Sequence, residues 1–252
     1  MNLNYRLLPL ALTAVLAAAP ALGAGPRGTR PVLPTVDAGE AASLTFMREE
    51  EKVARDTYLA MEARWDALPF ANIAQSEQQH MDAVKASLTK YALPDPVNPD
   101  LPGVFDNETL QQMYTDLLAR GETSYLEALR VGGLIEEVDI DDVQDAMDAT
   151  DNADLKTMYG NLLRGSRNHL RAFAAAIEAL GVVYEAQYLD QATVDAIIDS
   201  PMERGGMAGA PATDRVLAAL DDRETMERGG AGQGSGQGSG QGSKGKGKGT
   251  CS

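Results

Sequence analysis

Glu77 and His80 form a Glu-x-x-His pair in a stretch whose apolar residues recur every three or four positions. This spacing is typical of one face of an amphipathic helix, and residues three apart on a helix project from the same side. A carboxylate and an imidazole placed in this way can bind one metal ion. Burying such polar groups without partners would cost roughly 2–7 kcal/mol each, so the pattern predicts either a metal ion or an exposed surface pair.

Three further polar residues interrupt the apolar faces of other predicted helices. They are Glu51 in the first helix, Glu136 in the third and His169 in the fourth. The chain has only two histidines, and both lie on apolar faces of separate helices. Because carboxylates accompany them, metal binding explains the pair better than two isolated core histidines do. The predicted metal ligands are Glu51, Glu77, His80, Glu136 and His169.

The choice of Glu51 depends on the length of the linker between the first two helices. Pro69 predicts a linker over residues 66–71. With that linker, Glu51 and Glu77 are displaced from each other along the bundle axis by about two helical turns, on the order of 10 Å. A linker that runs back along the first helix would remove the mismatch. Otherwise Glu62 is the better ligand.

The acidic residues next to the predicted ligands are interpreted as surface groups or, in the third helix, as surface groups or groups that support the ligands. Glu49 and Glu50 lie off the apolar face of the first helix, in a charged turn near its N-terminus, where acids favour the helix dipole. Glu50 stays an alternative ligand from that helix. The acids around Glu136 that lie off the apolar stripe are Glu137, Asp139, Asp141 and Asp142.

Four long helices are predicted to position the ligands, starting at or near Ser43, Asn72, Ser124 and Asn152. The fourth is expected to run to about Leu180. A long connection at residues 92–121 joins the second helix to the third and contains a short helix at 107–120. Another short helix is expected at 191–199. This order predicts an all-α fold, a ferritin-like antiparallel four-helix bundle with a long crossover that contains a short extra helix.

The composition excludes several classes of function. The chain of 252 residues has a net charge of −15, which argues against nucleic acid as a partner. Its single cysteine, Cys251, excludes a thiol enzyme or a cysteine-ligated zinc site within the helical region. No strand pattern or glycine-rich phosphate loop is present. Metal ions are therefore the expected partners, and the sequence leaves open whether the chain forms a homo-oligomer.

The two ends of the chain differ from its body. The first 24 residues have a positive start at Arg6, a short apolar run and small residues at candidate cleavage sites, which is typical of a secretory signal. We therefore expect a protein exported to the periplasm or medium, with no stable membrane association after cleavage. The predicted segments are a signal peptide (1–24), a disordered lead-in (25–42), a helical domain (43–205), a boundary segment that allows a short helix (206–228) and a Gly/Ser/Gln/Lys tail (229–252).

Four stretches of the sequence resemble the ferritin-like family called domain of unknown function 2202 (DUF2202). The resemblance covers roughly residues 43–205. Within the wider superfamily, Glu51-x-x-Ala54-Arg55-x-x-Tyr58 is similar to the first-helix motif of rubrerythrins, and Glu77-x-x-His80 matches the second-helix ligand pair. The four stretches are 44–55 (LTFMREEEKVAR), 70–80 (FANIAQSEQQH), 131–140 (VGGLIEEVDI) and 165–173 (GSRNHLRAF).

The resemblance implies a dinuclear iron or manganese centre, with zinc as a further option, and chemistry on Fe(II), oxygen or peroxide. Tyr58 is then expected to donate a hydrogen bond to a ligand. One departure matters, because Ser166-x-x-His169 stands where the superfamily has a second Glu-x-x-His. Serine is a poor ligand, so Glu137 or Asp139 substitutes, or the site holds one metal, or the site is lost. A non-catalytic metal-buffering protein and a purely structural helical module are the alternatives.

Overall fold

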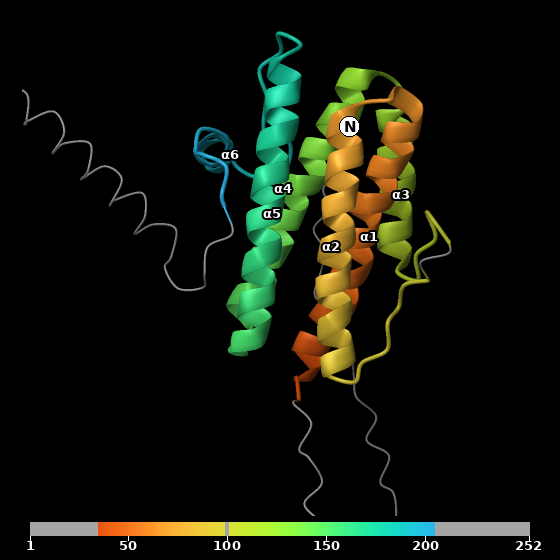
Figure 1. The fold of residues 1–252 in the computed structure, drawn as a ribbon, viewed down its shortest axis with the longest axis vertical. Coiled ribbons are helices and arrows are strands. Elements are labelled where there is room, and N and C mark those ends of the chain that lie inside the picture. The colour runs from red at the N-terminus through yellow and green to blue at the C-terminus, as the bar shows by residue number, and fades with distance from the viewer. Residues whose placement is uncertain (1–34, 99–100, 205–252) are drawn as a thin grey trace, which may run out of the picture. The chain divides into compact units, whose positions relative to one another are not determined.

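A computed structural model of the chain describes residues 35–98 and 101–204. The signal peptide, the boundary segment 206–228 and the tail predicted from the sequence lie outside these residues. The chain divides into two units, residues 1–199 and 200–252, and every helix named here belongs to the first. The described residues contain no strand and six α-helices (Figure 1): α1 (Ala38–Trp65), α2 (Leu68–Lys90), α3 (Glu108–Gly121), α4 (Tyr125–Ala149), α5 (Ala153–Glu178) and α6 (Gln191–Ile198).

The first helix begins earlier than Ser43, the predicted cap. Asp37 caps it by accepting a hydrogen bond from the backbone N–H of Glu40, whose side chain accepts one from the Asp37 N–H in return. This reciprocal capping box stabilises a start at Ala38, inside the predicted lead-in 25–42. The Ser43 hydroxyl is instead hydrogen bonded to the Tyr159 hydroxyl, 3.0 Å away.

The linker between α1 and α2 is much shorter than predicted. Only Asp66 and Ala67 separate the two helices, so the predicted linker over 66–71 and the predicted cap at Asn72 are wrong. Asp66 ends α1 in the left-handed conformation, with φ of 49°. Pro69 lies in the first turn of α2, where a missing N–H is tolerated, and so it starts the helix rather than breaking it.

The crossover from α2 to α4 is attached along α1. At one end, Glu49 accepts hydrogen bonds from the backbone N–H groups of Asp106 and Asn107, immediately before α3. At the other end, the Trp65 indole donates to the carbonyl of Gly121, the last residue of α3. Helix α3 therefore runs parallel to α1. The interpretation of Glu49 as a solvated residue is wrong, because its carboxylate is buried and holds this connection.

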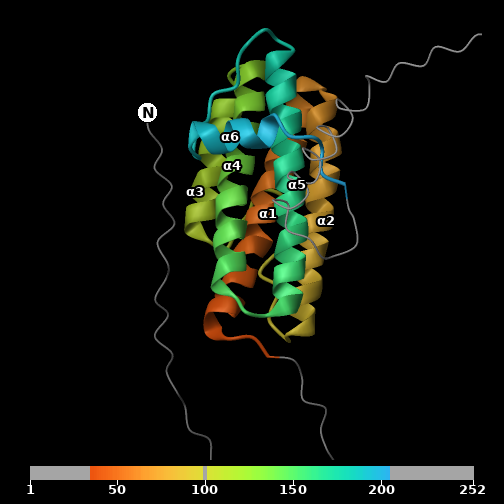
Figure 2. The same ribbon diagram turned by 90° about the vertical axis from the view of Figure 1, so that its left-hand side faces the viewer.

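Four long helices, α1, α2, α4 and α5, form the bundle (Figure 2). Short linkers make α1 antiparallel to α2 and α4 antiparallel to α5. Lys90 of α2 is paired with Asp154 of α5, and Ser76 is hydrogen bonded to His169, so α2 and α5 are also antiparallel. The fold is thus an all-α bundle with one long crossover that contains a short helix. Among the described helices, none is both long and apolar enough to cross a membrane.

Candidate metal centre

The structure brings together all five predicted ligands in the interior of the bundle. They come from α1, α2, α4 and α5, and their exposed fractions range from 1% to 9%. Two groups of three residues have potential ligand atoms that all lie within 4.8 Å of one another, and Glu77 belongs to both. The first group is Glu51, Glu77 and His80, and the second is Glu77, Glu136 and His169.

Glu77 lies between the two imidazole rings. Its Oε2 is 2.8 Å from Nδ1 of His80, and its Oε1 is 2.7 Å from Nδ1 of His169. The same Nδ1 atoms also approach a second carboxylate each, at 3.1 Å from Glu51 Oε2 and 3.4 Å from Glu136 Oε2. Both histidines therefore present Nδ1, and Glu77 presents one oxygen to each of them.

Several of these close contacts are not hydrogen bonds. The contact between His80 and Glu51 has the geometry of a hydrogen bond. The two oxygens of Glu77 and Nδ1 of His169 have no hydrogen-bond partner. One oxygen of Glu51, Oε1, is buried and unpartnered as well. The atoms are close but do not point along donor–acceptor lines. This arrangement is the one expected of groups that surround a common point. Without a metal ion, ion pairs with the two histidines balance the charge of Glu77.

The electrostatics of the cluster couple its acids to its bases. Burial disfavours charge on Glu77, but His169 and His80 outweigh it and hold the pKa of Glu77 far below its ordinary value. Burial would lower the imidazole pKa values. The facing carboxylates overcome it, so the pKa of His80 is raised well above 6.5 and that of His169 is raised to about 10. Both rings are therefore protonated at neutral pH when no metal is bound.

Glu51 behaves differently from Glu77. Burial, and then the charge of Asp139, raise the pKa of Glu51 well above its ordinary value, although His80 opposes this shift. The structure also settles which acid of the first helix lies at the cluster. With the two-residue linker, Glu51 is level with His80. Glu62 is half-buried, lies about three turns further along α1 and belongs to neither group.

Asp139 lies beside the serine that departs from the family pattern. The Ser166 hydroxyl donates a hydrogen bond to Oδ2 of Asp139. Burial and the neighbouring carboxylates of Glu136 and Glu77 raise the pKa of Asp139 to about 7. Of the two roles predicted for Asp139, the surface role is wrong, because it is 5% exposed, and a place beside the ligands is the one it occupies. It is the acid that the fold places against the cluster next to Ser166.

Glu137 faces away from the cluster. It is fully buried, and its oxygens accept hydrogen bonds from the backbone N–H groups of Gln187, Tyr188 and Leu189 and from the Tyr184 hydroxyl. Both roles predicted for it, on the surface or in support of the ligands, are therefore wrong. Glu137 cannot substitute for the missing ligand, because its carboxylate accepts hydrogen bonds from the segment that follows α5.

Tyr58 and Ser76 fix the orientation of two residues of the cluster. The Tyr58 hydroxyl donates to Oε1 of Glu136 over 2.5 Å, which places Tyr58 where a donor to a ligand was expected. Oγ of Ser76 is 2.9 Å from Nε2 of His169. The ring of Tyr58 packs against Phe173 and Phe70, with centroids 5.2 and 6.4 Å away, and closes one end of the cluster with apolar surface.

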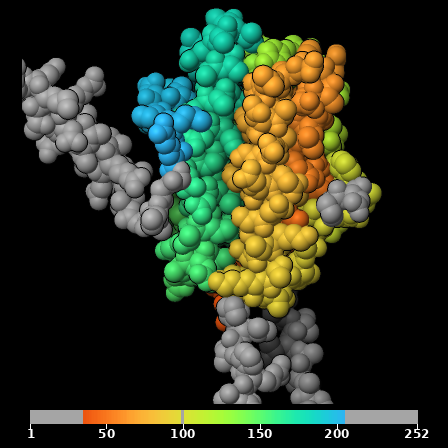
Figure 3. All heavy atoms as spheres, in the orientation of Figure 1, coloured from red at the N-terminus to blue at the C-terminus, as the bar shows by residue number. Residues whose placement is uncertain are grey.

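A cleft between α2 and α5 is lined by His80 and by Ser76, the residue bonded to His169. The cleft has a volume of about 380 Å³. The two helices that line it lie side by side on the face shown in Figure 3. Gly165 makes room for His80 there, because a Cβ atom at this position would be 2.3 Å from Nε2 of the ring. The residues that line the cleft are Ser76, Gln79, His80, Ala83, Asn161, Leu162, Arg164 and Gly165.

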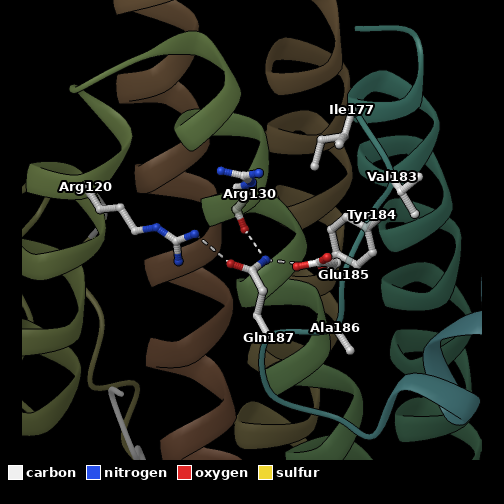
Figure 4. Close-up of a pocket in the computed structure, with 8 residues that line it drawn as sticks. All are labelled: Arg120, Arg130, Ile177, Val183, Tyr184, Glu185, Ala186 and Gln187. Carbon is white, nitrogen blue, oxygen red and sulfur yellow. Dashed lines mark hydrogen bonds between the residues drawn. The ribbon is translucent and has the colours of Figure 1, made fainter. Parts of the chain in front are cut away.

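A second pocket, of about 280 Å³, contains none of the cluster residues. It lies between α3, α4, the end of α5 and the segment that follows α5 (Figure 4). Gln187 is its central group: its carbonyl accepts from Arg120, and its amide donates to the Arg130 carbonyl and to the Tyr184 hydroxyl. These polar groups bond to one another, so the pocket serves to attach the segment after α5 rather than to extend the cluster.

Comparison with known proteins gives consistent matches. Residues 40–201 match a family model described as "Uncharacterized protein domain (DUF2202)". The protein MJ0754 of Methanocaldococcus jannaschii is 47% identical over 166 residues, which are 66% of this chain and 90% of that protein. The crystal structure of the hypothetical protein MJ0754 from Methanococcus jannaschii superposes with a TM-score of 0.65 at 44% identity, covering 70% of this chain and 100% of that one.

Proposed function

The chain belongs to the DUF2202 family, and we propose that it is an exported ferritin-like protein that binds two iron or manganese ions in the interior of its bundle. The observation that carries this proposal is Glu77, a buried carboxylate with both oxygens unpartnered and one imidazole beside each. The proposal of export rests on the signal-like pattern of the first 24 residues. N-terminal sequencing of the protein recovered outside the cytoplasm would test it.

The donor set fits such a pair of ions. Glu51, Glu77 and His80 would hold one ion, and Glu77, Glu136 and His169 would hold the other. Oxygen and imidazole donors suit iron and manganese, and they also accept zinc. Asp139 belongs to neither group, but it is bonded to Ser166, which stands in place of a ligand carboxylate.

The topology supports the ferritin-like assignment. One long crossover between the second and third bundle helices is a feature of ferritin-like folds. Those folds draw one Glu from each of two helices and a Glu-x-x-His pair from each of the other two. Here Glu51 and Glu136 correspond to the single acids, Glu77 and His80 to one pair, and His169 to half of the other.

Bound iron or manganese would supply one-electron redox chemistry toward oxygen or peroxide. The chain's own residues do the positioning. Tyr58 fixes Glu136, and Ser76 fixes the ring of His169 through its far nitrogen, which is how protein groups commonly orient metal-binding side chains. The aromatic rings at one end exclude water. The cleft between α2 and α5 leaves the His80 ring as the point of approach for a small molecule.

A redox enzyme and a metal-buffering protein are separated by one assay. The full chain is loaded anaerobically with Fe(II), and oxygen or peroxide consumption is followed beside the Glu77→Gln variant. We expect Fe(II) oxidation to be accelerated by the wild-type chain only. Tight binding without acceleration would reject the enzymatic role and favour metal buffering. The replacement of a ligand carboxylate by Ser166 is the feature of the sequence that favours buffering.

Metal affinity should increase with pH. The raised pKa values of His80 and His169 mean that an incoming ion must displace protons from both rings at neutral pH. For each displaced proton, the apparent affinity should rise about tenfold per pH unit below the pKa of about 10 of His169. Competition of the protein with a chromophoric chelator for Mn(II) at pH 6, 7 and 8 measures this slope. A pH-independent affinity would contradict the assignment of the imidazoles as ligands.

Gly165→Ala should weaken the first metal site without unfolding the chain. The added Cβ would lie 2.3 Å from Nε2 and 2.5 Å from Cε1 of His80, so the ring must move. Displacing a ligand ring should reduce Mn(II) affinity at that site by about 10–100-fold, as loss of an orienting group does.

Gly160→Ala is the matched control on the same helix. The nearest atom to its Cβ would be Sδ of Met147 at 4.0 Å, so the change should leave affinity unaltered and stabilise α5 by up to about 1 kcal/mol. Titration calorimetry and thermal unfolding of both variants give the comparison. Equal affinities for Gly165→Ala and Gly160→Ala would show that His80 is not a ligand.

A further inference from the structure

Glu50 is a buried acid that the proposed metal centre does not use. It is 4% exposed, and neither of its oxygens has a hydrogen-bond partner. The prediction that it belongs to a solvated turn is therefore wrong. Two acids of α4 carry buried, unpartnered oxygens near it, namely Oδ2 of Asp142 and Oδ1 of Asp139. An isolated buried carboxylate is costly, so a positive charge or a proton must compensate this group.

These acids form a succession from the surface to the cluster. Glu50 interacts with Asp142 on its outer side and with Asp139 and Glu51 on its inner side. Asp142 is half-buried and also interacts with Asp145, which is exposed. On α4, residues 139 and 142 are three apart, as are 142 and 145, so each acid is adjacent to the next on the helix surface.

No basic side chain of α1 near Glu50 neutralises it. Arg48 is bonded to Asp95 and to the carbonyl of Met81, and Lys52 is bonded to Asp56 and to carbonyls of the crossover. The charges that act most strongly on Glu50 are all negative. No basic side chain of α1 therefore balances the acids between α1 and α4, and a proton or a bound cation must do so.

We propose that Asp142 and Glu50 form the route by which divalent cations reach the metal centre, passing from solvent to Asp139 and Glu51. This inference rests on the proposed function. Carboxylates without imidazole suit hard cations such as Mn(II) and Fe(II) before they reach nitrogen ligands. Among the described residues, these acids are not one of the groups whose ligand atoms all lie within 4.8 Å, which fits a path better than a tight chelate.

The cleft between α2 and α5 is unsuited to this task. It contains no acid among its lining residues, and Arg164 lies on it with one nitrogen hydrogen bonded to Asn161. Cations would therefore enter between α1 and α4, while the cleft remains for a neutral or anionic molecule. The cation route and the cleft therefore lie between different pairs of helices.

The rate of Co(II) uptake by the metal-free full chain tests the route. Visible absorption that develops as Co(II) gains nitrogen ligands is followed by stopped flow. Charged paths raise association rates by factors of ten or more, so Glu50→Gln and Asp142→Asn should each slow uptake about tenfold. The final amount of bound Co(II) should be unchanged. Added salt should slow the wild-type chain more than either variant.

Glu62→Gln, the same change on the same helix outside the path, is the control and should load like the wild-type chain. Uptake at the wild-type rate in both Glu50→Gln and Asp142→Asn would overturn the inference, and so would a loss of bound Co(II) at equilibrium, which would make Glu50 a ligand. If Glu50→Gln does not fold, Asp142→Asn decides, because its side chain is half-buried. Failure of the wild-type chain to bind Co(II) would instead reject the proposed function.

Discussion

Glu77→Gln should abolish the binding of both metal ions, because Glu77 is the residue that the two ligand groups share. Glutamine keeps the shape of the side chain but replaces one carboxylate oxygen with an amide nitrogen that cannot bind a metal ion. We expect Mn(II) affinity to fall more than about 100-fold at both sites, beyond the effect of losing an orienting group. Titration calorimetry on the metal-free chain measures both the affinity and the number of ions.

The histidine variants give the comparison for Glu77. His80→Ala should remove the ion held with Glu51, and His169→Ala should remove the ion held with Glu136. Circular dichroism should show that all three variants keep their helices, which separates a loss of binding from a loss of fold. Two ions retained by Glu77→Gln would show that this residue does not bridge the sites.

Glu137→Ala should cause the largest loss of stability of any single change considered for this chain. It removes the acceptor of three backbone N–H groups and of the Tyr184 hydroxyl at a position that is 0% exposed. Each buried donor left without a partner costs about 1–3 kcal/mol, so the free energy of unfolding should fall by roughly 3 kcal/mol or more. Urea denaturation of the metal-free chain measures it.

Asp141→Asn is the matched control for Glu137, one turn further along α4. Asp141 is half-buried and accepts a hydrogen bond from the Tyr188 hydroxyl, which can reach water instead. Its replacement should cost less than about 1 kcal/mol. Glu137→Ala should leave metal affinity unchanged in the folded chain. Comparable losses for the two variants, or a metal defect in Glu137→Ala, would contradict the role given to Glu137.

The cluster residues could be predicted from the sequence because each of them lies on the apolar face of its helix. Glu51, Glu77, His80, Glu136 and His169 replace apolar residues in regular patterns, and the structure brings these five together. The patterns failed for Glu49 and Glu50 because every residue of α1 from Met47 to Tyr58 is buried. The crossover and α4 cover the side of α1 that was expected to face solvent. The local sequence of α1 contains no pattern that predicts this cover.

The errors in helix starts and in the neighbouring acids have similar causes. The sequence predicts a break at Pro69, although proline is also favoured in the first turn of a helix, and the outcome depends on tertiary packing. Glu137 and Asp139 lie off the apolar stripe of α4, but the segment after α5 covers one and Ser166 of α5 bonds to the other. Both contacts join residues far apart in the chain, so helical periodicity could not reveal them.

The most direct test of the metal centre is anomalous X-ray scattering from crystals of the full chain soaked with Mn(II). We predict two anomalous peaks, one bounded by Glu51, Glu77 and His80 and the other by Glu77, Glu136 and His169. One peak would reject the dinuclear centre but keep metal binding. No peak near Glu77, with hydrogen bonds or water satisfying its oxygens instead, would contradict the account.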